Sequence, residues 1–321
     1  MPREKAAGAG KRAKKSGGGT GAVSLAARAF GQEPIEAALP SKLAPGLYVV
    51  STPIGNLGDI TLRALKTLAS VSAVLCEDTR VTGKLLAAYG ISARKIPYHD
   101  HNAAEARPEI LRRLKAGEAL ALVSDAGTPL VSDPGYKLVR AAIGEGVAVT
   151  AIPGASAALA SLVLSGLPPD AFAFAGFLPP KSAARKRALR EWKSVHATLL
   201  FYESATRLAA SLADMAEMLG ARPAAVTREL TKLYEEVRRG NLAELAAFYR
   251  AQGAPKGEMV VAVGPPGGDA DPSGGEALDR DLAAALSRTS LRQAVAEVAA
   301  ATGLPRRVVY ARALQLKGEQ G

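Results

Sequence analysis

ALALVSDAGTPLVSDPG, residues 119–135, joins a short apolar run to a turn rich in glycine and proline. The run is almost continuously apolar, which is typical of a strand covered on both faces of a sheet. Two further segments have the same design, LYVVSTPIGN at 47–56 and VAVTAIPGASA at 147–157. In open α/β sheets, ligands bind at the carboxyl ends of the strands, where glycine allows close approach. The three turns therefore predict one shared ligand site.

Short apolar runs alternate with amphipathic stretches along most of the chain. A first set of strands is expected at 47–52, 71–76, 119–124 and 147–152, with a helix over 60–69. A second set is expected at 171–177, 197–202, 224–229 and 258–263. This alternation predicts two α/β lobes with mostly parallel sheets covered by helices on both faces. A break near Pro153–Gly154 places the lobes at 45–153 and 154–266.

The two ends of the chain differ from these lobes. Residues 1–44 are rich in Gly, Ala and Lys/Arg without sustained periodicity, which predicts a disordered basic arm. A linker at 267–280 precedes a small helical module at 281–321. There, Ser290 and Gln293 have the spacing of a capping box, and Gly303-Leu304-Pro305 predicts a turn before a second, basic helix. This helix-turn-helix outline is compatible with nucleic-acid contact and equally with packing or dimer contacts.

Composition restricts the class of protein. The chain has 48% hydrophobic and 22% charged residues, the balance of a soluble globular protein. Because no apolar run approaches the ~18 residues of a membrane helix and no signal-peptide core follows the N-terminal charges, we expect a cytoplasmic location and no membrane contact. Cys76 is the only cysteine, so an internal disulfide is excluded. With three scattered histidines, no metal site is expected.

Basic residues are clustered. The net charge is +11, and the first 20 residues, with six cations and one acid, contribute +5 of it. Between Lys181 and Lys193, six cations face Glu191 alone. Such clusters suit a polyphosphate partner, although a solvated surface explains them as well. The candidate contacts are Lys181, Arg185, Lys186, Arg187, Arg190, Arg306 and Arg307. Trp192 lies within the first cluster, where a core anchor is favoured over a base-stacking platform.

The three turns lack the signatures of a nucleotide-phosphate site. No G-x-x-x-x-G-K-[ST] motif occurs, and no G-x-G-x-x-G follows a strand and opens a helix. The turns offer prolines, small residues and hydroxyls instead. They predict a cleft for a compact, folded ligand without phosphates, and they disfavour a nicotinamide-dependent enzyme.

The three turns resemble the S-adenosylmethionine-binding loops of the tetrapyrrole methylase superfamily. The fuller pattern resembles the branch that methylates small-subunit ribosomal RNA, and its motifs follow in order from residue 51 to residue 260. They are STPIGNLGDIT (51–61), CEDTR (76–80), TGKLL (82–86), YHDHN (98–102), SDAGTP (124–129), IPGAS (152–156), GFLPPK (176–181), FYES (201–204), RELTK (228–232) and KGEMV (256–260). The resemblance implies a two-lobed α/β fold with S-adenosylmethionine between the lobes, a homodimer, and 2′-O-methylation of a cytidine ribose in 16S RNA of the 30S particle.

The same resemblance implies a cofactor site, which carries over residue by residue. The positions are Pro53 in the first turn, Ala126, Gly127, Thr128, Pro129, Val131 and Ser132 in the second, Ser156 and Ala157 in the third, and Glu203 and Leu230 in the second lobe. The second turn departs from the Gly-Gly-Asp-Pro run of other superfamily members. The role of Asp125 therefore stays open between contact with the ammonium of the cofactor and capping of a helix.

Methyl transfer to a ribose hydroxyl benefits from a base or from a group that stabilises developing negative charge. The catalytic candidates are Glu77, Arg80, His99 and Lys232. His99 suits a base on its unperturbed pKa, but a structural histidine fits equally. Lys232 would serve if desolvation lowered its pKa. Glu77 and Arg80 are also compatible with a structural ion-pair cluster, so the sequence does not select the base.

Two other functions fit parts of the pattern. A small-molecule methyltransferase for tetrapyrrole precursors would share the fold, but a compact substrate requires neither the basic clusters nor the helical module. A non-catalytic RNA-binding assembly factor with a vestigial pocket would share the basic surface. Saturable binding of S-adenosylmethionine separates this factor from an enzyme, and binding to ribosomal RNA separates the two substrate classes.

Overall fold

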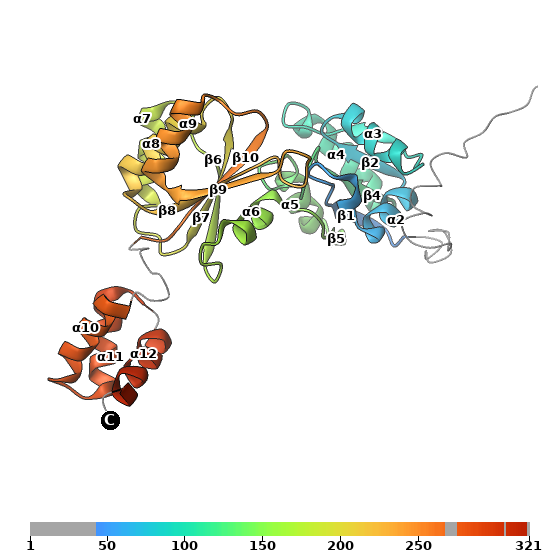
Figure 1. The fold of residues 1–321 in the computed structure, drawn as a ribbon. Coiled ribbons are helices and arrows are strands. Elements are labelled where there is room, and N and C mark those ends of the chain that lie inside the picture. Colours follow the sequence, from blue (N-terminus) through green and yellow to red (C-terminus); the bar gives the residue numbers. More distant parts are fainter. Residues whose placement is uncertain (1–42, 267–274, 305, 320–321) are drawn as a thin grey trace, which may run out of the picture. The chain divides into compact units, whose positions relative to one another are not determined.

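The computed structural model describes residues 43–266, 275–304 and 306–319 of the 321-residue chain (Figure 1). The chain divides into two compact units, Met1–Ala157 and Ala158–Gly321. The predicted basic arm falls almost entirely outside the described residues, as does the first part of the predicted linker.

The first unit contains a five-stranded parallel sheet. Its spatial order is β3 (Lys95–Pro97), β2 (Ala73–Cys76), β4 (Ala119–Leu122), β1 (Gly46–Val50) and β5 (Val149–Ile152). Strands β2 and β4 are buried along their whole length, which explains why their sequences are continuously apolar. The parallel lobe expected from the sequence is confirmed here. The short edge strand β3 was not predicted because three residues give no periodic signal.

Helices cover both faces of this sheet. They are α2 (Leu62–Ser70), α3 (Thr79–Ala88), α4 (Ala103–Lys115) and α5 (Tyr136–Gly144), with a short 3-10 turn at Leu57–Asp59. Alternate strand residues separate into two cores. Tyr48, Val50 and Cys76 pack on one face, whereas Leu47 and Leu75 pack on the other. Local caps fix where the helices begin, because the side chains of Thr61 and Asp78 accept hydrogen bonds from the first turns of α2 and α3.

The second unit contains a mixed sheet. Its order is β6 (Phe172–Phe177), β7 (Thr198–Ser204), β10 (Glu258–Val263), β8 (Pro223–Arg228) and β9 (Glu236–Asn241). Only β6 and β7 pair in parallel, whereas β10 is antiparallel to β7 and β8, and β9 is antiparallel to β8. The expectation of mostly parallel strands is therefore wrong for this sheet. The cause is the short 229–235 connection, which joins β8 to β9 as a hairpin, whereas a parallel pair requires a longer crossover.

Helices also cover the mixed sheet. They are α6 (Ala157–Ser165), α7 (Ser182–Glu191), α8 (Leu208–Leu219) and α9 (Leu242–Gln252). The last three share one core with Leu199 and Phe201 of β7, and α6 packs through Ala158 and Leu162 against Leu200. Trp192 packs against the larger core with its ring edge-on to Phe201. Its interpretation as a core anchor is confirmed.

The C-terminal helices α10 (Gly275–Leu286), α11 (Leu291–Thr302) and α12 (Arg306–Glu319) form a small bundle with its own core. Helix α10 begins within the stretch predicted as linker. The predicted capping box of Ser290 and Gln293 is confirmed, as is the left-handed C-cap at Gly303. Arg312, one of the cations of this basic helix, pairs through its guanidinium with Asp279 of α10 at 2.6 Å.

Two general features concern the described residues only. None of their helices combines the length and apolarity needed to cross a membrane. No group of His, Cys, Asp or Glu among them is arranged to hold a metal ion. Cys76, the single cysteine, is a free thiol that is fully buried in the first unit.

Candidate active site

Three loops meet at one edge of the parallel sheet. They follow β4, β1 and β5, which are neighbours in the sheet and run in the same direction, so their carboxyl ends lie together. The first two loops pair through their backbones: Thr52 N donates to Gly127 O at 2.9 Å, and Gly127 N donates to Thr52 O at 3.1 Å. The predicted convergence of the loops of the first unit is thus present in the structure.

Hydroxyl groups join the same loops. The hydroxyls of Ser51 and Thr128 lie 3.1 Å apart, and Thr128 Oγ1 also donates to Ala155 O at 3.2 Å. Thr128, which the sequence suggested as a cofactor contact, therefore connects all three loops. Gly154 lies so close to Ser51 that an added Cβ atom would come within 2.9 Å of the serine Cβ. Only glycine permits this approach of the third loop to the first.

The loop after β4 has an unusual backbone. Gly127, Leu130, Ser132 and Gly135 all have positive φ, at 80°, 73°, 65° and 133°. For the two residues with side chains, this left-handed conformation costs of order 1 kcal/mol each. Such strain is maintained only where surrounding contacts impose it, and two of the four described non-glycine residues with positive φ lie in this loop.

The candidate cofactor residues of the first unit lie on these three loops. Gly127 and Pro129 are buried, whereas Asp125, Ala126 and Ser132 are exposed. Pro53, Thr128, Val131, Ser156 and Ala157 are half-buried. Asp125 accepts a hydrogen bond from Asp78 N at 3.1 Å. This contact, at the start of α3, favours the capping role that the sequence left open for Asp125.

Acidic side chains gather beside the loops, and no Lys or Arg occurs in 51–56, 124–135 or 152–157. Burial raises the pKa of Asp133 to about 6; the hydrogen bond with Ser124 lowers it, and the charges of Glu77 and Asp125 raise it. Burial likewise raises the pKa of Glu77, with Asp125 and Asp100 adding to the effect. These carboxylates, together with loops that contain no Lys or Arg, fit a positively charged ligand without phosphates. A sulfonium compound that carries an ammonium group is such a ligand.

Asp133→Asn should change how stability depends on pH. Because the pKa of Asp133 is raised in the folded state, the folded protein binds more protons than the unfolded chain between about pH 4 and pH 6. Stability should therefore fall as pH rises through this window in the wild type. The variant, which lacks this group, should gain unfolding free energy relative to the wild type at pH 7 and gain less at pH 4. Urea titrations at both pH values measure the difference, and an equal effect at both would contradict it.

Two other catalytic candidates of the first unit, Arg80 and His99, form polar contacts with neighbouring residues. Arg80 is largely exposed and pairs with Asp78 at 2.6 Å. The backbone N–H of His99 donates to Asn102 Oδ1 at 2.9 Å, which orders the turn before α4. Within the described residues, His99 Nδ1 is buried without a hydrogen-bond partner. Arg80 is thus engaged in an ion pair, whereas Glu77 forms no ion pair within the described residues and His99 keeps a ring nitrogen without a hydrogen-bond partner.

Lys232 does not fit the role of base. Its ammonium group lies 2.9 Å from Glu229 and 3.1 Å from Glu258. Desolvation lowers the pKa of Lys232, but the hydrogen bonds and charges of these two carboxylates outweigh it, so the pKa is raised overall. Lys232 is therefore protonated at neutral pH and braces the connection between β8 and β9.

The two cofactor candidates of the second unit are both buried. The Glu203 side chain is 0% exposed and pairs with Arg207 at 2.8 Å. It also accepts hydrogen bonds from Ser204 N and the Ser211 hydroxyl. The carboxylate of Glu203 is therefore not free to bind a cofactor, because its oxygens are engaged inside the unit. Leu230 is buried and lies between Glu229 and Thr231, which both have left-handed backbones.

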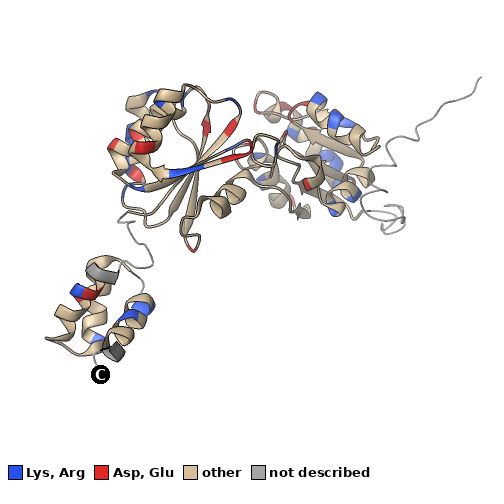
Figure 2. Cartoon of the chain, viewed as in Figure 1, with Lys and Arg blue, Asp and Glu red and all other residues tan. Residues whose placement is uncertain are grey.

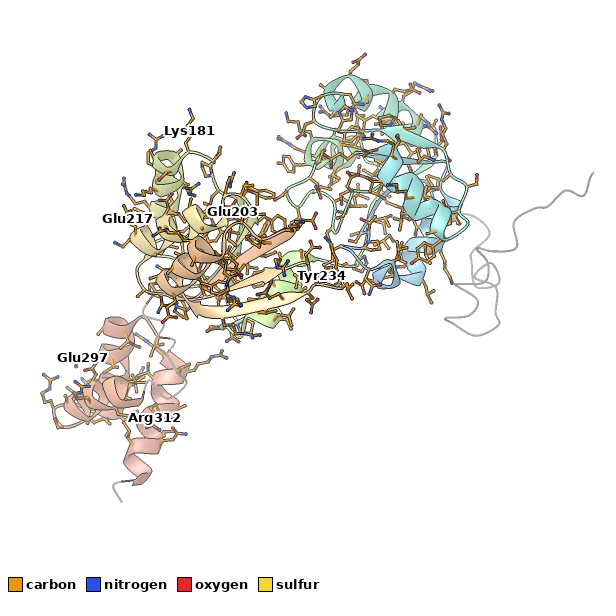
Figure 3. All side chains as sticks on the ribbon, turned by 45° about the horizontal axis from the view of Figure 1, so that its top comes forward. Lys181, Glu203, Glu217, Tyr234, Glu297 and Arg312 are labelled. Atoms are coloured by element: carbon orange, nitrogen blue, oxygen red, sulfur yellow. The ribbon has the colours of Figure 1, made fainter. Side chains whose placement is uncertain are left out.

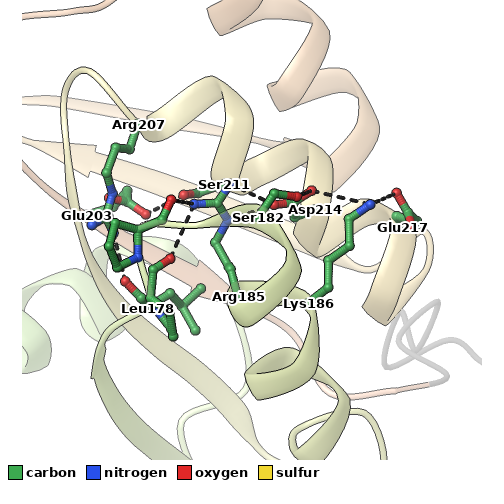
Figure 4. Close-up of polar contacts among 11 residues, drawn as sticks. Leu178, Ser182, Arg185, Lys186, Glu203, Arg207, Ser211, Asp214 and Glu217 are labelled. Carbon is green, nitrogen blue, oxygen red and sulfur yellow. Dashed lines mark hydrogen bonds and ion pairs between the residues drawn. The ribbon is translucent and has the colours of Figure 1, made fainter.

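The basic cluster around α7 separates into two groups. Arg185 is only 3% exposed and pairs with Asp214 of α8 at 2.6 Å, so its prediction as an RNA contact is wrong. Lys186 is half-buried and pairs with Glu217 at 2.6 Å. Figure 4 shows both pairs. The remaining cations of this cluster are exposed: Lys181, Arg187, Arg190 and Lys193. Arg306 and Arg307 of α12 are also exposed.

Sequence reasoning did not select Ser51, Asp133 and Gly154 as site residues, although all three lie in the quoted turns. The Asp-Pro-Gly run at 133–135 was a signal for Asp133, because a carboxylate in a turn at a strand end faces the ligand edge. The contact between Gly154 and Ser51 joins loops about a hundred residues apart and has no local signal.

Comparisons with known proteins agree with this architecture. The model of the family "Tetrapyrrole (Corrin/Porphyrin) Methylases" matches residues 46–246, and the "RsmI C-terminal HTH domain" matches residues 272–317. A uroporphyrin-III C-methyltransferase from Thermus thermophilus superposes with a TM-score of 0.50 at 22% identity, covering 68% of this chain and 94% of its own. That likeness shows the fold. The chain is thus a methylase of the tetrapyrrole methylase family.

Within that family, curated relatives define the branch. A protein of Mesorhizobium japonicum is 53% identical over 280 residues, which cover 87% of this chain and 95% of the relative. A protein of Erythrobacter litoralis is 55% identical over 275 residues, which cover 86% and 96%. Both are named ribosomal RNA small subunit methyltransferase I, and the chain belongs to this family. It is a methyltransferase that uses S-adenosylmethionine.

Proposed function

We propose that the chain methylates the 2′-hydroxyl of a cytidine ribose in the 16S RNA of the small ribosomal subunit. Its relatives are named for methylation of small-subunit ribosomal RNA. The main support for a methyl-donor site is the set of three loops after β4, β1 and β5, which hydrogen bonds join to one another. The charged side chains beside these loops are acidic. Exposed cations on α7 and α12 supply a surface for phosphates.

The proposed reaction depends mainly on positioning. S-adenosylmethionine supplies an electrophilic methyl group, which the ribose oxygen approaches in line from behind. The loops tied together by Thr128 would hold the donor, and Gly127 and Pro129 are buried residues of these loops. Glu77 and His99 are the proposed proton acceptors, since Arg80 and Lys232 are already engaged in ion pairs. The raised pKa of Glu77 makes its carboxylate a stronger base than an exposed glutamate.

The test is methylation of small subunits that lack the modification. The purified protein should transfer labelled methyl groups from S-adenosylmethionine to 16S RNA at one cytidine. Because a 2′-O-methyl group removes the internal nucleophile of alkaline cleavage, the product should resist hydrolysis at that position. A methyl group on the base would contradict the ribose assignment. Methylation of a tetrapyrrole precursor in place of RNA would support the small-molecule alternative, and saturable cofactor binding without transfer would contradict the enzymatic function.

The exposed cations should control the salt dependence of RNA binding. Arg187→Ala combined with Arg190→Ala is expected to lower affinity and to reduce the slope of log K against log salt by ~1 for each lost phosphate contact. Both residues lie on the exposed face of α7. Fluorescence anisotropy with a 16S fragment at several salt concentrations measures the slope. Arg112→Ala, in an exposed ion pair with Glu109 on α4 of the first unit, is the matched control. An unchanged slope in the α7 double variant would contradict the assignment of these cations as phosphate contacts.

We further propose a homodimer that acts in the cytoplasm, as the resemblance implies. Helix α6 supports a dimer contact because Leu159 and Val163 are 50% and 79% exposed, while Ala158 and Leu162 pack inward. Apolar side chains with this exposure on one helix face are typical of an interface. Light scattering after size-exclusion chromatography tests it, and Val163→Asp should shift a dimer towards monomer.

A further inference from the structure

Two arginines hold the turn that follows edge strand β6. Arg207 Nη2 donates to Leu178 O at 2.9 Å, and Arg185 Nη1 donates to Pro180 O at 3.1 Å. Arg185 also reaches Pro179 O at 3.4 Å. The two prolines have no N–H of their own, so ordinary turn hydrogen bonds are restricted here. The turn Leu178–Lys181 therefore owes its conformation to side chains of α7 and of the segment before α8.

Buried carboxylates orient these arginines. Glu203 holds Arg207 at 2.8 Å and is itself bonded by Ser211; Asp214 holds Arg185 at 2.6 Å and accepts from Ser182 at 3.0 Å. Figure 4 shows these two groups of contacts and the pair of Lys186 with Glu217. Buried ion pairs contribute little stability relative to apolar residues of the same size, because desolvation offsets their attraction. What such a network supplies is a fixed geometry, and here it fixes the turn.

The fixed turn presents an aromatic ring and a cation to solvent. Phe177, the last residue of β6, is 58% exposed and lies edge-on to Tyr202 with 5.5 Å between ring centres. Lys181 is exposed at the start of α7, where it is labelled in Figure 3. Arg187 and Arg190 follow on the exposed surface of the same helix. An exposed ring at the end of a strand, followed along the chain by a row of exposed cations, matches the stacking and phosphate contacts used for unpaired nucleotides.

We propose that Phe177 and Lys181 form a preordered contact for an unpaired nucleotide of the RNA substrate, with the base stacked on Phe177 and a phosphate bound by Lys181. This inference rests on the proposed function, because it names a contact of the RNA that the enzyme methylates. Charge complementarity selects RNA as the occupant: the helix that follows the turn carries exposed cations, and Lys181, Arg187 and Arg190 form no ion pair within the described residues, unlike Lys186. Because Arg185 and Arg207 already order the turn, binding requires little further loss of conformational freedom.

The experiment compares Phe177→Leu and Lys181→Ala with Phe172→Leu. Phe172 lies at the other end of β6 and is 45% exposed, so it controls for loss of an exposed ring on the same strand. We expect Phe177→Leu to raise Kd for a single-stranded 16S fragment and KM for small subunits about tenfold, with kcat and the Kd of S-adenosylmethionine unchanged. Lys181→Ala should weaken binding less and reduce the salt slope by ~1, whereas Phe177→Leu should leave the slope unchanged. Phe172→Leu should match the wild type.

The outcomes separate this contact from the function itself. If the wild type methylates 16S RNA and Phe177→Leu has wild-type Kd and KM, the contact is wrong while the function stands. If the wild type does not methylate RNA, the proposed function itself is wrong. A change of oligomeric state in Phe177→Leu, measured by light scattering, with unchanged RNA affinity per protomer would show that the ring contacts protein, and this would also overturn the proposal. Both variant positions are exposed, so loss of folding is not expected.

Discussion

Asp214→Ala is expected to lower the free energy of unfolding of the second unit by about 3–5 kcal/mol, the usual cost of removing one partner of a buried ion pair. Asp214 pairs with Arg185 at 2.6 Å and accepts a hydrogen bond from the Ser182 hydroxyl at 3.0 Å. Without the carboxylate, a guanidinium that is 3% exposed would keep its charge and lose its counterion. Two carbonyls of the Leu178–Lys181 turn would be its only remaining partners among those described.

The single tryptophan allows the unfolding of the second unit to be measured separately from that of the first. Trp192 packs beside Phe201 in the core of the second unit, so its fluorescence during urea denaturation reports on this unit. Arg187→Ala, an exposed position on the same helix, is the matched control and should change stability by less than about 0.5 kcal/mol. The double variant Arg185→Met with Asp214→Leu should recover most of the loss, since it removes both charges. A cost below about 1 kcal/mol for Asp214→Ala would contradict the structural role.

Gly127→Val is expected to weaken binding of S-adenosylmethionine at least tenfold, or ~1.4 kcal/mol. Gly127 has φ of 80° and exchanges two backbone hydrogen bonds with Thr52. A Cβ atom at this position would lie 3.3 Å from Ile54 Cγ2, and a β-branched residue is a strong outlier in the left-handed region. The loop should shift, and its contacts with the first and third loops should be lost with it.

Gly117→Val is the matched control. Gly117 has φ of 86°, and an added Cβ would meet no atom within 4 Å. It therefore imposes the same backbone strain in the same unit without disturbing the three loops. Calorimetric titration should give wild-type cofactor affinity for Gly117→Val and reduced affinity for Gly127→Val, with similar losses of thermal stability. Equal affinity in the two variants would indicate that the 127 loop does not hold the cofactor.

Some features of the fold and site followed from local sequence. The run 119–124 predicted a strand buried on both faces, and the parallel direction of such strands brought the three turns to one edge. The Ser290–Gln293 spacing predicted the start of α11, because a capping box depends on neighbours only. Strand β9 was missed since, as an edge strand, it carries acidic and basic residues (Figure 2) and no apolar alternation.

Other features depended on partners that are distant in sequence. Arg185 lies in a row of cations and was expected at the surface, but Asp214, 29 residues further along the chain, draws its guanidinium inward. Glu229 and Glu258 similarly determine the protonation of Lys232 from two different segments. Charge and periodicity describe one helix at a time, so they do not reveal which cations are neutralised by the neighbouring helix.

The burial of Cys76 has a practical consequence. Its side chain is fully enclosed, and burial raises the pKa of the thiol, which outweighs the hydrogen bond with Thr82 that lowers it. Since the thiolate is the reactive species, maleimide reagents and mild peroxide should leave the native protein unmodified. A cysteine introduced at a surface position would then be the sole site of dye attachment, which makes the natural sequence a ready background for single-molecule fluorescence.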